Sequence, residues 1–560
     1  MVFGAMVGVA TGLGVVGFYR LIDLSHFIFI RWPDAHLPRV AHAFYQPVLT
    51  ALGVWSAWAL VHRSRIPDGQ NVPDVQLAVA KRDGVLSGKP VIVRTVASAF
   101  TLGSGGSAGS EGPVAVLGAA VGSSLGRRLR FQPKHLKILL GCGAAAGIAG
   151  AFNAPFAGAF FALEEVLGSF SVSAFSPVVI ASVVGALTVR PFLGSHPIFE
   201  LPSVPDVHPI ASALLFPILG IACGWMSALH SRLSLAAPRL FARIPGPEWV
   251  RPVIGGALTG VIVLLSRGLL AGDGHLAIPR AIFGSGGLAW WILLAIALAK
   301  VVSTAATLGS GGSGGVFTPT LFIGAALGGG LGVLGNQLLP AHIVNPQAWA
   351  LVGMAGLIAG ATRAPLTAIF MVFEMTDDYG YVVPLMIVAV IAYVTAKRFA
   401  EHGLYDGWLA ARGEHLAHGV DRAVMDRLHV HEVMDSSAIT VAPDVHLREL
   451  ITVSSRTRQS MFPVVESSHR LVGMITHHAL REAIVARGAL ADVVVAEDLA
   501  ESTESLTPGQ SLREALSIMN TRGLDALPVV ATHNGESTFK GVITRADILQ
   551  AYEDVMARTV

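Results

Sequence analysis

The sequence predicts a polytopic all-α membrane protein with an internal repeat, followed by a soluble α/β tail. Of the 560 residues, 52% are hydrophobic and only 14% are charged, against about 25% charged in soluble domains. Residues 401–560 hold 36 of the 76 charged side chains, with a net charge of −8, whereas residues 1–400 carry +10. This composition excludes a single soluble domain and a disordered chain. The overall charge of +2 does not indicate nucleic-acid binding.

Apolar stretches recur along the first 400 residues, roughly at 2–18, 48–62, 113–126, 137–162, 174–196, 207–230, 251–272, 287–306, 316–339, 347–373 and 380–396. A straight span needs about 20 apolar residues, and several stretches are shorter or are broken by Gly and Pro. Broken helices are tolerated at membrane depth only where protein or a water-filled cavity satisfies the freed backbone. No basic stretch precedes residues 1–18, so we expect a mature membrane helix there and not a cleaved signal. The two cysteines, Cys142 and Cys223, indicate neither a disulfide framework nor a metal site.

An internal repeat divides the membrane part into two halves. Residues 101–126 and 307–332 are identical at 15 of 26 positions, at a shift of 206. Residues 143–166 and 353–376 match at 10 of 24 positions, at a shift of 210. Gly/Pro-interrupted segments at matching places in two halves indicate a binding site between the repeats near the bilayer midplane.

Charge inside these stretches is sparse. Glu111 is the only ionisable residue within 95–126, and Glu164 and Glu165 are the only charges within 138–189. An acid inside a span costs at least about 2.5–3.5 kcal/mol on insertion scales, so a functional role is the default expectation. We expect Glu111 and Glu165 to be functional. Glu164 has an aligned acid in the second half, which indicates a structural role.

The Gly-rich breaks can bind an anion. A helix N-terminus offers unpaired N–H groups and about half a positive charge. Helices are predicted to start at GSEGP (109–113) and GGVFTPTL (314–321), and PDGQNVPDV (67–75) has the same Gly/Pro character. Three such loops at the midplane would form an anion pocket without basic side chains. Glu111 would occupy that pocket when ionised and leave it when protonated, which links anion and proton movement.

These motifs, in this order and on a duplicated core, resemble the CLC family of chloride channels and chloride/proton antiporters. The resemblance covers about residues 1–415 and lacks the family's most N-terminal helix. GSEGP is similar to the family's G-[KR]-E-G-P, GGVFTPTL to its G-G-x-F-x-P-x-L, and PDGQNVPDV to its G-S-G-I-P-E. The resemblance implies an inverted repeat of many tilted and broken helices, and a homodimer with one pathway in each subunit.

The same resemblance implies roles for individual residues. Glu111 corresponds to the external gating glutamate and Glu165 to the internal proton glutamate of the antiporters. Family members that are channels usually have an apolar residue at the position of Glu165. Tyr405 corresponds to the tyrosine whose hydroxyl faces the central anion. The backbone N–H groups of Val316 and Phe317 correspond to the anion-coordinating amides.

Two residues depart from the family pattern at this site. Gln70 replaces the anion-ligating serine, so selectivity among chloride, nitrate and other halides is open, although an amide N–H₂ can still donate to an anion. Ser110 replaces the basic residue of the gate motif, which removes one positive charge near the outer mouth. Glu111 and Gly112 keep the E-G-P intact, which favours chloride over the fluoride-exporting branch.

The tail holds a second, unrelated repeat. Residues 433–484 and 497–552 share a strand–helix rhythm, with FPVV against LPVV and GMIT against GVIT. The pair resembles two CBS domains, which often bind adenosine nucleotides such as ATP, ADP or AMP. Thr544 and Asp547 are the candidate ribose contacts, whereas the first copy has Ala479 instead of the aspartate. A dimerisation module without a ligand is the alternative. The predicted boundaries are 1–415 for the membrane part with halves 1–206 and 207–415, a linker at 416–432, and CBS domains at 433–490 and 491–560.

The sequence therefore predicts a transporter and not an enzyme, one that exchanges protons for a small anion, most simply chloride. A passive chloride channel of the same fold is the nearer alternative. A serine hydrolase is the remote one, because Ser107 and Ser313 lie in G-x-S-x-G patterns but have no His or Lys near them in sequence. No cofactor or metal is required, and no nucleic acid is expected. We expect contact with membrane lipid, a place in the inner membrane, and a cytoplasmic tail on the side of the basic run 127–130.

Overall fold

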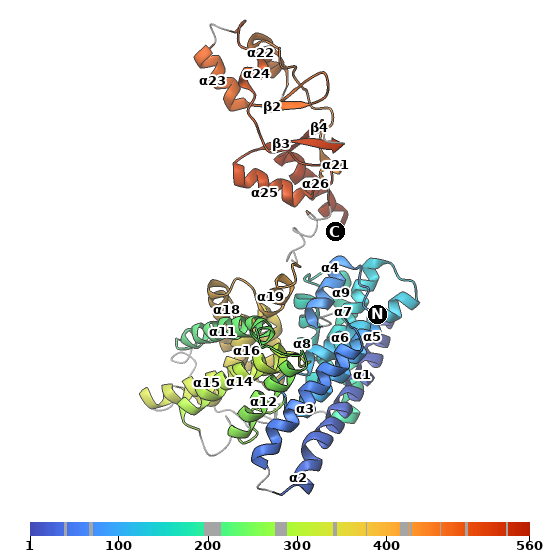
Figure 1. Ribbon diagram of the computed structural model, residues 1–560, viewed down its shortest axis with the longest axis vertical. Coiled ribbons are helices and arrows are strands. Elements are labelled where there is room, and N and C mark those ends of the chain that lie inside the picture. Colours follow the sequence, from blue (N-terminus) through green and yellow to red (C-terminus); the bar gives the residue numbers. More distant parts are fainter. Residues whose placement is uncertain are drawn as a thin grey trace. The chain divides into compact units, whose positions relative to one another are not determined.

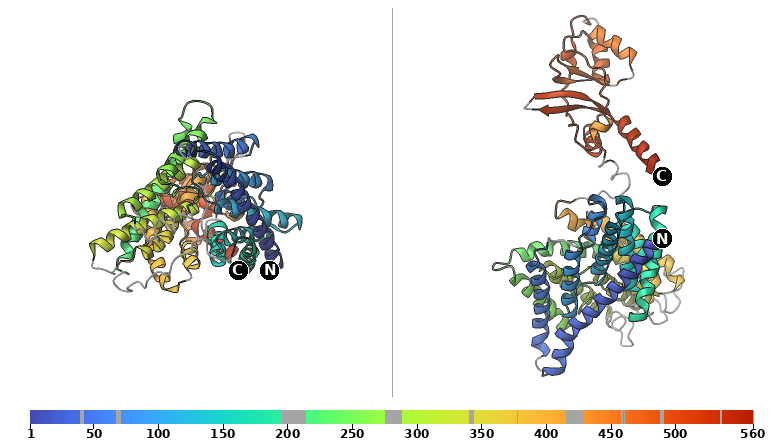
Figure 2. Two further views of the ribbon diagram at one scale, coloured as in Figure 1. Left: turned by 90° about the horizontal axis from the view of Figure 1, so that it is seen from below. Right: turned by 90° about the vertical axis from the view of Figure 1, so that its right-hand side faces the viewer.

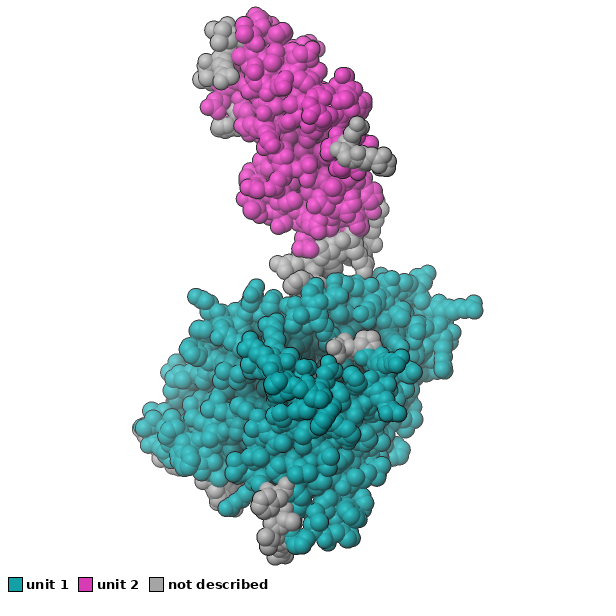
Figure 3. All heavy atoms as spheres, viewed as in Figure 1, with its two compact units in different colours: residues 1–416 teal, residues 417–560 magenta. Residues whose placement is uncertain are grey.

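The computed structural model describes residues 1–38, 42–66, 71–194, 214–274, 288–339, 344–376, 378–414, 425, 428–457, 459, 461–487, 491–533 and 536–559. The predicted Gln70 falls outside these residues. The chain forms two compact units, residues 1–416 and 417–560 (Figure 3). Each unit is described by itself below.

Unit 1 is helical throughout its described residues (Figure 1). Its first half contains α1 (Val2–His26), η1 (Phe27–Arg31), α2 (Trp32–His36), α3 (His42–Arg63), α4 (Val72–Lys81), α5 (Gly88–Gly103), α6 (Glu111–Arg128), α7 (Pro133–Phe152), α8 (Pro155–Phe161), η3 (Ala162–Val166) and α9 (Val172–Leu193). Its second half contains α11 (Phe216–Ala242), α12 (Val250–Leu265), α14 (Trp290–Gly309), α15 (Phe317–Leu338), α16 (Pro346–Thr362), α17 (Pro365–Thr376), η4 (Tyr379–Tyr381), α18 (Val382–Phe399) and α19 (Leu404–Ala410).

Six helical segments of the described residues are long and apolar enough to cross a membrane: Val2–His36, Pro133–Phe152, Val172–Leu193, Trp290–Gly309, Phe317–Leu338 and Tyr379–Ala410. Some of the other apolar helices are too short to cross a membrane, as the Gly and Pro breaks predict. Proline opens α7, α8, α16 and α17, at the start of a helix, where its missing N–H costs no hydrogen bond. The predicted all-α membrane unit is confirmed.

The two sequence repeats form two similar bodies that lie side by side. The first half, blue to teal, and the second half, green to orange, occupy opposite sides of unit 1 in Figure 1 and in the left view of Figure 2. Glycines at equivalent places bring backbones into contact in both. A Cβ on Gly118 would lie 2.0 Å from the carbonyl oxygen of Gly143, and a Cβ on Gly324 would lie 2.3 Å from that of Gly353. Glycine at these positions therefore allows α6 to pack on α7 and α15 on α16.

Unit 2 contains two strand pairs with short helices. The first copy has α21 (Val430–Val433), α22 (Leu447–Arg456), β1 (Met461–Val465), β2 (Leu471–Thr476) and α23 (His477–Arg487). The second has α24 (Ala496–Leu499), α25 (Leu512–Arg522), β3 (Ala526–His533), β4 (Glu536–Thr544) and α26 (Arg545–Thr559). Both strand pairs are antiparallel, with a register shift at the equivalent Val464/Val465 and Val529/Val530. Met461, Met474, Ala526 and Val542 form a small apolar cluster that joins the two strand pairs. The predicted α/β tail with an internal repeat is confirmed.

Candidate functional site

The two Gly-rich loops meet at the contact between the repeats. The Gly109 amide donates to the Gly315 carbonyl at 2.8 Å, and the Gly315 amide donates to the Gly109 carbonyl at 2.7 Å. This two-bond bridge places the start of α6 against the start of α15. Gly112 has no room for a side chain, because its Cβ would lie 2.9 Å from the Gly315 Cα atom. The loops that contain GSEGP and GGVFTPTL therefore lie together at the boundary between the repeats.

Hydroxyl groups fasten the same loops across the repeat boundary. The Ser107 Oγ lies 2.8 Å from the Thr304 Oγ1, and its repeat equivalent Ser313 lies with its Oγ 3.0 Å from the Ser98 Oγ. The two serine amides donate to threonine hydroxyls of the opposite repeat at 3.1 Å. A hydroxyl cannot act as a general base for a serine nucleophile at neutral pH. The two G-x-S-x-G matches are thus explained by loop packing, which argues against a hydrolase.

Glu111 occupies the N-terminus of α15. Its Oε1 accepts hydrogen bonds from the amides of Phe317 at 2.6 Å and Thr318 at 3.0 Å. Its Oε2 accepts from the Thr318 hydroxyl at 2.6 Å. The Glu111 residue is only 2% exposed, so helix-end dipoles and hydrogen bonds replace its lost hydration. The carboxylate thus lies where a helix N-terminus would bind an anion.

The amides that donate to Glu111 belong to residues 317 and 318, whereas the resemblance implies anion coordination by the amides of residues 316 and 317. Val316, expected to offer an amide, is the N-cap residue of α15, and its N–H is not a donor to Glu111 in the described structure. Thr318 was missed, although a threonine next to a predicted helix start is a recognisable donor. Ser110 is the N-cap residue of α6, and its Oγ lies 3.1 Å from the Tyr19 hydroxyl.

Glu165 lies in η3, a short π-helix within the apolar region, and short π-helical turns often mark functional positions. Gln76 on α4 holds it: the Gln76 Nε2 donates to the Glu165 carbonyl at 2.8 Å and to the Glu165 Oε2 at 3.0 Å. The Gln76 residue is 4% exposed. Sequence reasoning missed this contact, although a polar residue in the apolar α4 just after a Gly/Pro loop was a usable signal.

Tyr405 lies near the start of α19 and is 4% exposed. Its hydroxyl makes no hydrogen bond with the described residues and interacts electrostatically with both Glu165 and Glu111. Of these three side chains Glu111 and Tyr405 are buried and Glu165 is half-buried, and the tyrosine is in electrostatic range of both acids.

Glu164 and its repeat equivalent Glu374 have a different role. The Glu164 carboxylate accepts from the Leu366 and Thr367 amides at 3.1 and 2.7 Å, at the start of α17. The Glu374 carboxylate accepts from the amides of Phe156 and Ala157 at 2.9 and 2.7 Å, at the start of α8. Each acid thus caps a helix of the other repeat, and we call the pair the reciprocal caps.

A cavity of about 970 Å³ borders the second Gly-rich loop, lined by Gly311 and Gly314 together with Asn71. Among the described residues its lining is strongly basic, with Arg63, Arg65, Arg94, Arg251 and Arg412 against one acid, Glu248. Such a surface raises the local concentration of anions. We call it the basic cavity.

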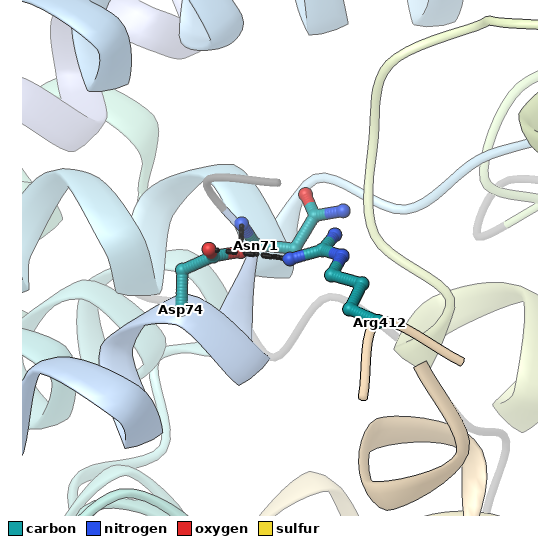
Figure 4. A network of polar contacts seen from close by, with 3 residues as sticks. All are labelled: Asn71, Asp74 and Arg412. Atoms are coloured by element: carbon teal, nitrogen blue, oxygen red, sulfur yellow. Dashed lines mark hydrogen bonds and ion pairs between the residues drawn. The ribbon is translucent and has the colours of Figure 1, made fainter. Parts of the chain in front are cut away.

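One wall of the basic cavity is fixed by ion pairs between α4 and the segment after α19. Arg412 Nη1 lies 3.2 Å from the Asp74 Oδ2, which also accepts from the Asn71 amide at 3.2 Å (Figure 4). The Asp74 side chain is 6% exposed. At the other end of α4, Lys81 Nζ lies 2.6 Å from the Glu414 Oε2. Both ends of the helix that carries Gln76 are therefore attached to the segment that carries Tyr405.

Comparison with known families identifies the chain. The family model "Voltage gated chloride channel" matches residues 48–397, more than half of the chain. The chain belongs to the CLC family. The CBS domain model matches residues 430–486 and 495–554.

Relatives of this CLC protein include transporters and channels. It is 37% identical to the putative chloride channel protein ClcB-like of Ralstonia nicotianae, over 65% of this chain and 85% of that one. It is 31% identical to the H(+)/Cl(−) exchange transporter ClcA of Yersinia pestis bv. Antiqua, over 73% and 87%. A solved slow cyanobacterial Cl−/H+ antiporter superposes with a TM-score of 0.66 at 26% identity, covering 74% and 97%. A eukaryotic CLC transporter shares the fold along 97% of both chains, with a TM-score of 0.63 at 19% identity.

The CBS region of this CLC protein contains the two predicted ribose contacts side by side. The Asp547 Oδ2 accepts from the Thr544 amide at 2.9 Å and from the Thr544 hydroxyl at 2.7 Å. The carboxylate therefore lies over the start of α26, with Oδ1 not used in this contact. In the first copy only the Thr476 hydroxyl is present, accepting from the Ala479 amide at 3.1 Å.

Proposed function

We propose that this CLC protein exchanges a small anion, chloride, for protons, with one pathway in each subunit of a homodimer. One observation carries the proposal: the Glu111 carboxylate lies on the Phe317 and Thr318 amides, where an anion would bind. When Glu111 gains a proton, its negative charge is lost and the amides are free to bind chloride. When it loses the proton, the carboxylate competes with the anion. One site thus couples two ions of opposite charge.

The departures from repeat symmetry support an exchanger over a passive pore. Acids that the fold needs occur in both repeats, as the reciprocal caps do. Glu111 aligns with Phe317, and Glu165 aligns with Met375, so neither acid has a counterpart in the other repeat. A buried acid without a symmetric structural role is a functional candidate. Glu165, held by Gln76 and in electrostatic range of Tyr405, would pass protons between Glu111 and the inner solution.

The setting of the protein is part of the same proposal. The basic cavity would collect anions on the inner side, and unit 1 would lie in the inner membrane with the CBS pair in the cytoplasm. An adenosine nucleotide at Thr544 and Asp547 would regulate transport. Two similarities support exchange, since the Yersinia relative is named an exchange transporter and the cyanobacterial neighbour an antiporter.

The proposal is tested on the purified full-length protein in lipid vesicles with a chloride gradient. We expect protons to move against their own gradient, driven by chloride. Glu111→Ala should abolish proton movement while chloride flux persists, because the competing carboxylate is gone. Glu374→Ala, which removes a structural acid, is the matched control and should keep the coupling. Chloride flux without proton movement in the native protein would show a passive channel instead.

A further inference from the structure

A second cavity of about 690 Å³ lies between α1, α3, α12 and the loop that follows α12. We call it the outer cavity, because it contains residues of η1 and α2, at the end of unit 1 opposite to α4 and α19 (Figure 1). It is lined by Tyr19 and Asp273, neither of which has a role so far. Its other titratable lining groups are Asp23, His26, Arg31, Asp34, Tyr45 and Arg267.

Two contacts join the wall of the outer cavity to the loop that precedes Glu111. The Tyr19 hydroxyl, in its wall, lies 3.1 Å from the Oγ of Ser110, the residue before Glu111. The Gly272 amide, next to Asp273, donates to the Gly105 carbonyl at 3.3 Å, and Gly105 belongs to the loop that leads into α6. The loop that carries Asp273 is therefore joined directly to the loop that carries the gate.

A buried lysine fixes the position of Asp273. Lys300, on α14, is fully buried. Its Nζ donates to the carbonyls of Leu270 at 3.1 Å and Gly272 at 2.8 Å, and it lies 5.3 Å from the centre of the Phe322 ring. A cation at this depth is costly unless it is well satisfied. Here it holds the backbone on either side of Ala271, in the segment directly before Asp273.

The Asp273 carboxylate interacts electrostatically with Lys300, Tyr19 and Glu111. It is thus a titratable group in the wall of a cavity of about 690 Å³, and its loop is hydrogen-bonded to the loop that leads to Glu111. A cavity of this volume with polar walls can hold water molecules that hydrogen-bond between such groups.

We infer that Asp273 exchanges protons between the outer solution and Glu111, an inference that rests on the proposed proton-coupled transport. A proton from outer water binds the Asp273 carboxylate. The O–H bond of Asp273 then breaks while an O–H bond forms on Glu111, through water in the outer cavity. Asp273 returns to its ionised form, and neutral Glu111 leaves the Phe317 and Thr318 amides. The reverse sequence releases a proton outside, and no other reactant is needed.

A purely structural role makes a different prediction. If Asp273 only balances the charge of Lys300, its loss should lower stability and slow transport equally at every pH. A proton relay instead matters most when free protons are scarce. The pH and buffer dependence of transport therefore separates the two roles.

The test uses the full-length protein in vesicles, with equal pH on both sides and transport followed by proton and chloride flux. Asp273→Asn should slow exchange by roughly tenfold or more at alkaline pH. The deficit should shrink as the pH falls, or when a membrane-impermeant buffer is added to shuttle protons. Asp273→Glu should retain most of the rate. Tyr19→Phe, which removes only a hydroxyl, should slow exchange less and in the same pH range.

Asp23→Asn is the matched control, because Asp23 lines the same cavity from α1 and lies outside the loop that is hydrogen-bonded to Gly105; its rate should be unchanged. An Asp273→Asn rate equal to that of the native protein, or a deficit independent of pH and of buffer, would overturn the relay. A native protein that moves no protons would refute the proposed exchange itself, which is a distinguishable result.

Discussion

At the scale of single residues, the site depends on the Glu111 carboxylate, which lies where the proposed anion would bind. Three donors hold the Glu111 carboxylate, and two of them belong to Thr318. The hydroxyl of Thr318 binds the carboxylate directly, whereas its amide would remain after substitution. The balance between carboxylate and chloride should therefore be adjustable at Thr318.

Thr318→Val removes the hydroxyl and keeps the shape of the side chain. A hydrogen bond to a charged group contributes about 1.5–3 kcal/mol, so chloride should displace the ionised Glu111 more easily. We expect the chloride concentration for half-maximal binding, measured by calorimetry, to fall by roughly tenfold. The same substitution in a Glu111→Gln background should have a much smaller effect. An equal shift in both backgrounds would mean that Thr318 acts on chloride and not through Glu111.

Much of this site could be predicted from residues alone, because Gly/Pro breaks and lone acids leave local signals. Glu111 and Glu165 were singled out in this way, whereas Tyr405 came from the family resemblance alone. Thr318 was missed because the first amides of α15 depend on where the helix begins, within one residue. Gln76 was missed because its partner Glu165 lies 89 residues away along the chain. Asp273 was missed because Glu111 lies in the other half of the membrane unit, so only the fold brings the two loops together.

At the scale of secondary structure elements, the helix starts of α8 and α17 depend on the opposite repeat. Both acceptors of the reciprocal caps serve amides that have no intrahelical partner. This explains why Glu164 and Glu374 are aligned in the two halves, whereas Glu111 and Glu165 have no aligned acid.

Removal of either reciprocal cap should lower stability without changing coupling. Glu374→Ala should cost about 1–2 kcal/mol, the range for loss of an N-terminal cap, and Glu164→Ala should behave alike. Thermal unfolding in detergent measures the loss, and proton-to-chloride ratios in vesicles measure the coupling. Glu374→Gln keeps one acceptor oxygen and should lose less stability. A changed ratio with native stability would instead place Glu374 on the proton pathway.

At the scale of the whole molecule, the chain joins a basic, apolar unit to an acidic one, each with its own internal repeat. The two CBS copies differ at one position of the proposed nucleotide site, where the second copy has Asp547 and the first has Ala479. A single nucleotide site, in the second copy, is the expected outcome.

Asp547→Ala should weaken AMP binding to the full-length protein by roughly tenfold, since a charged hydrogen bond is worth about 1.5–3 kcal/mol. Calorimetric titration measures this directly. Thr544→Ser keeps the hydroxyl and is the control that should bind nearly as well. If the native protein takes up no AMP, ADP or ATP, the tail serves only in assembly and stability.

The reciprocal caps also have a consequence for how such a duplicated chain can evolve. Since each half completes helices of the other, neither ancestral copy is self-sufficient once the exchange of acids is established. Drift at position 164 or 374 is penalised in the partner half, which keeps this part of the duplication alike. Glu111 and Glu165 take part in no such reciprocal cap. At these positions the two halves could therefore diverge, and the acids could be kept in the first half alone.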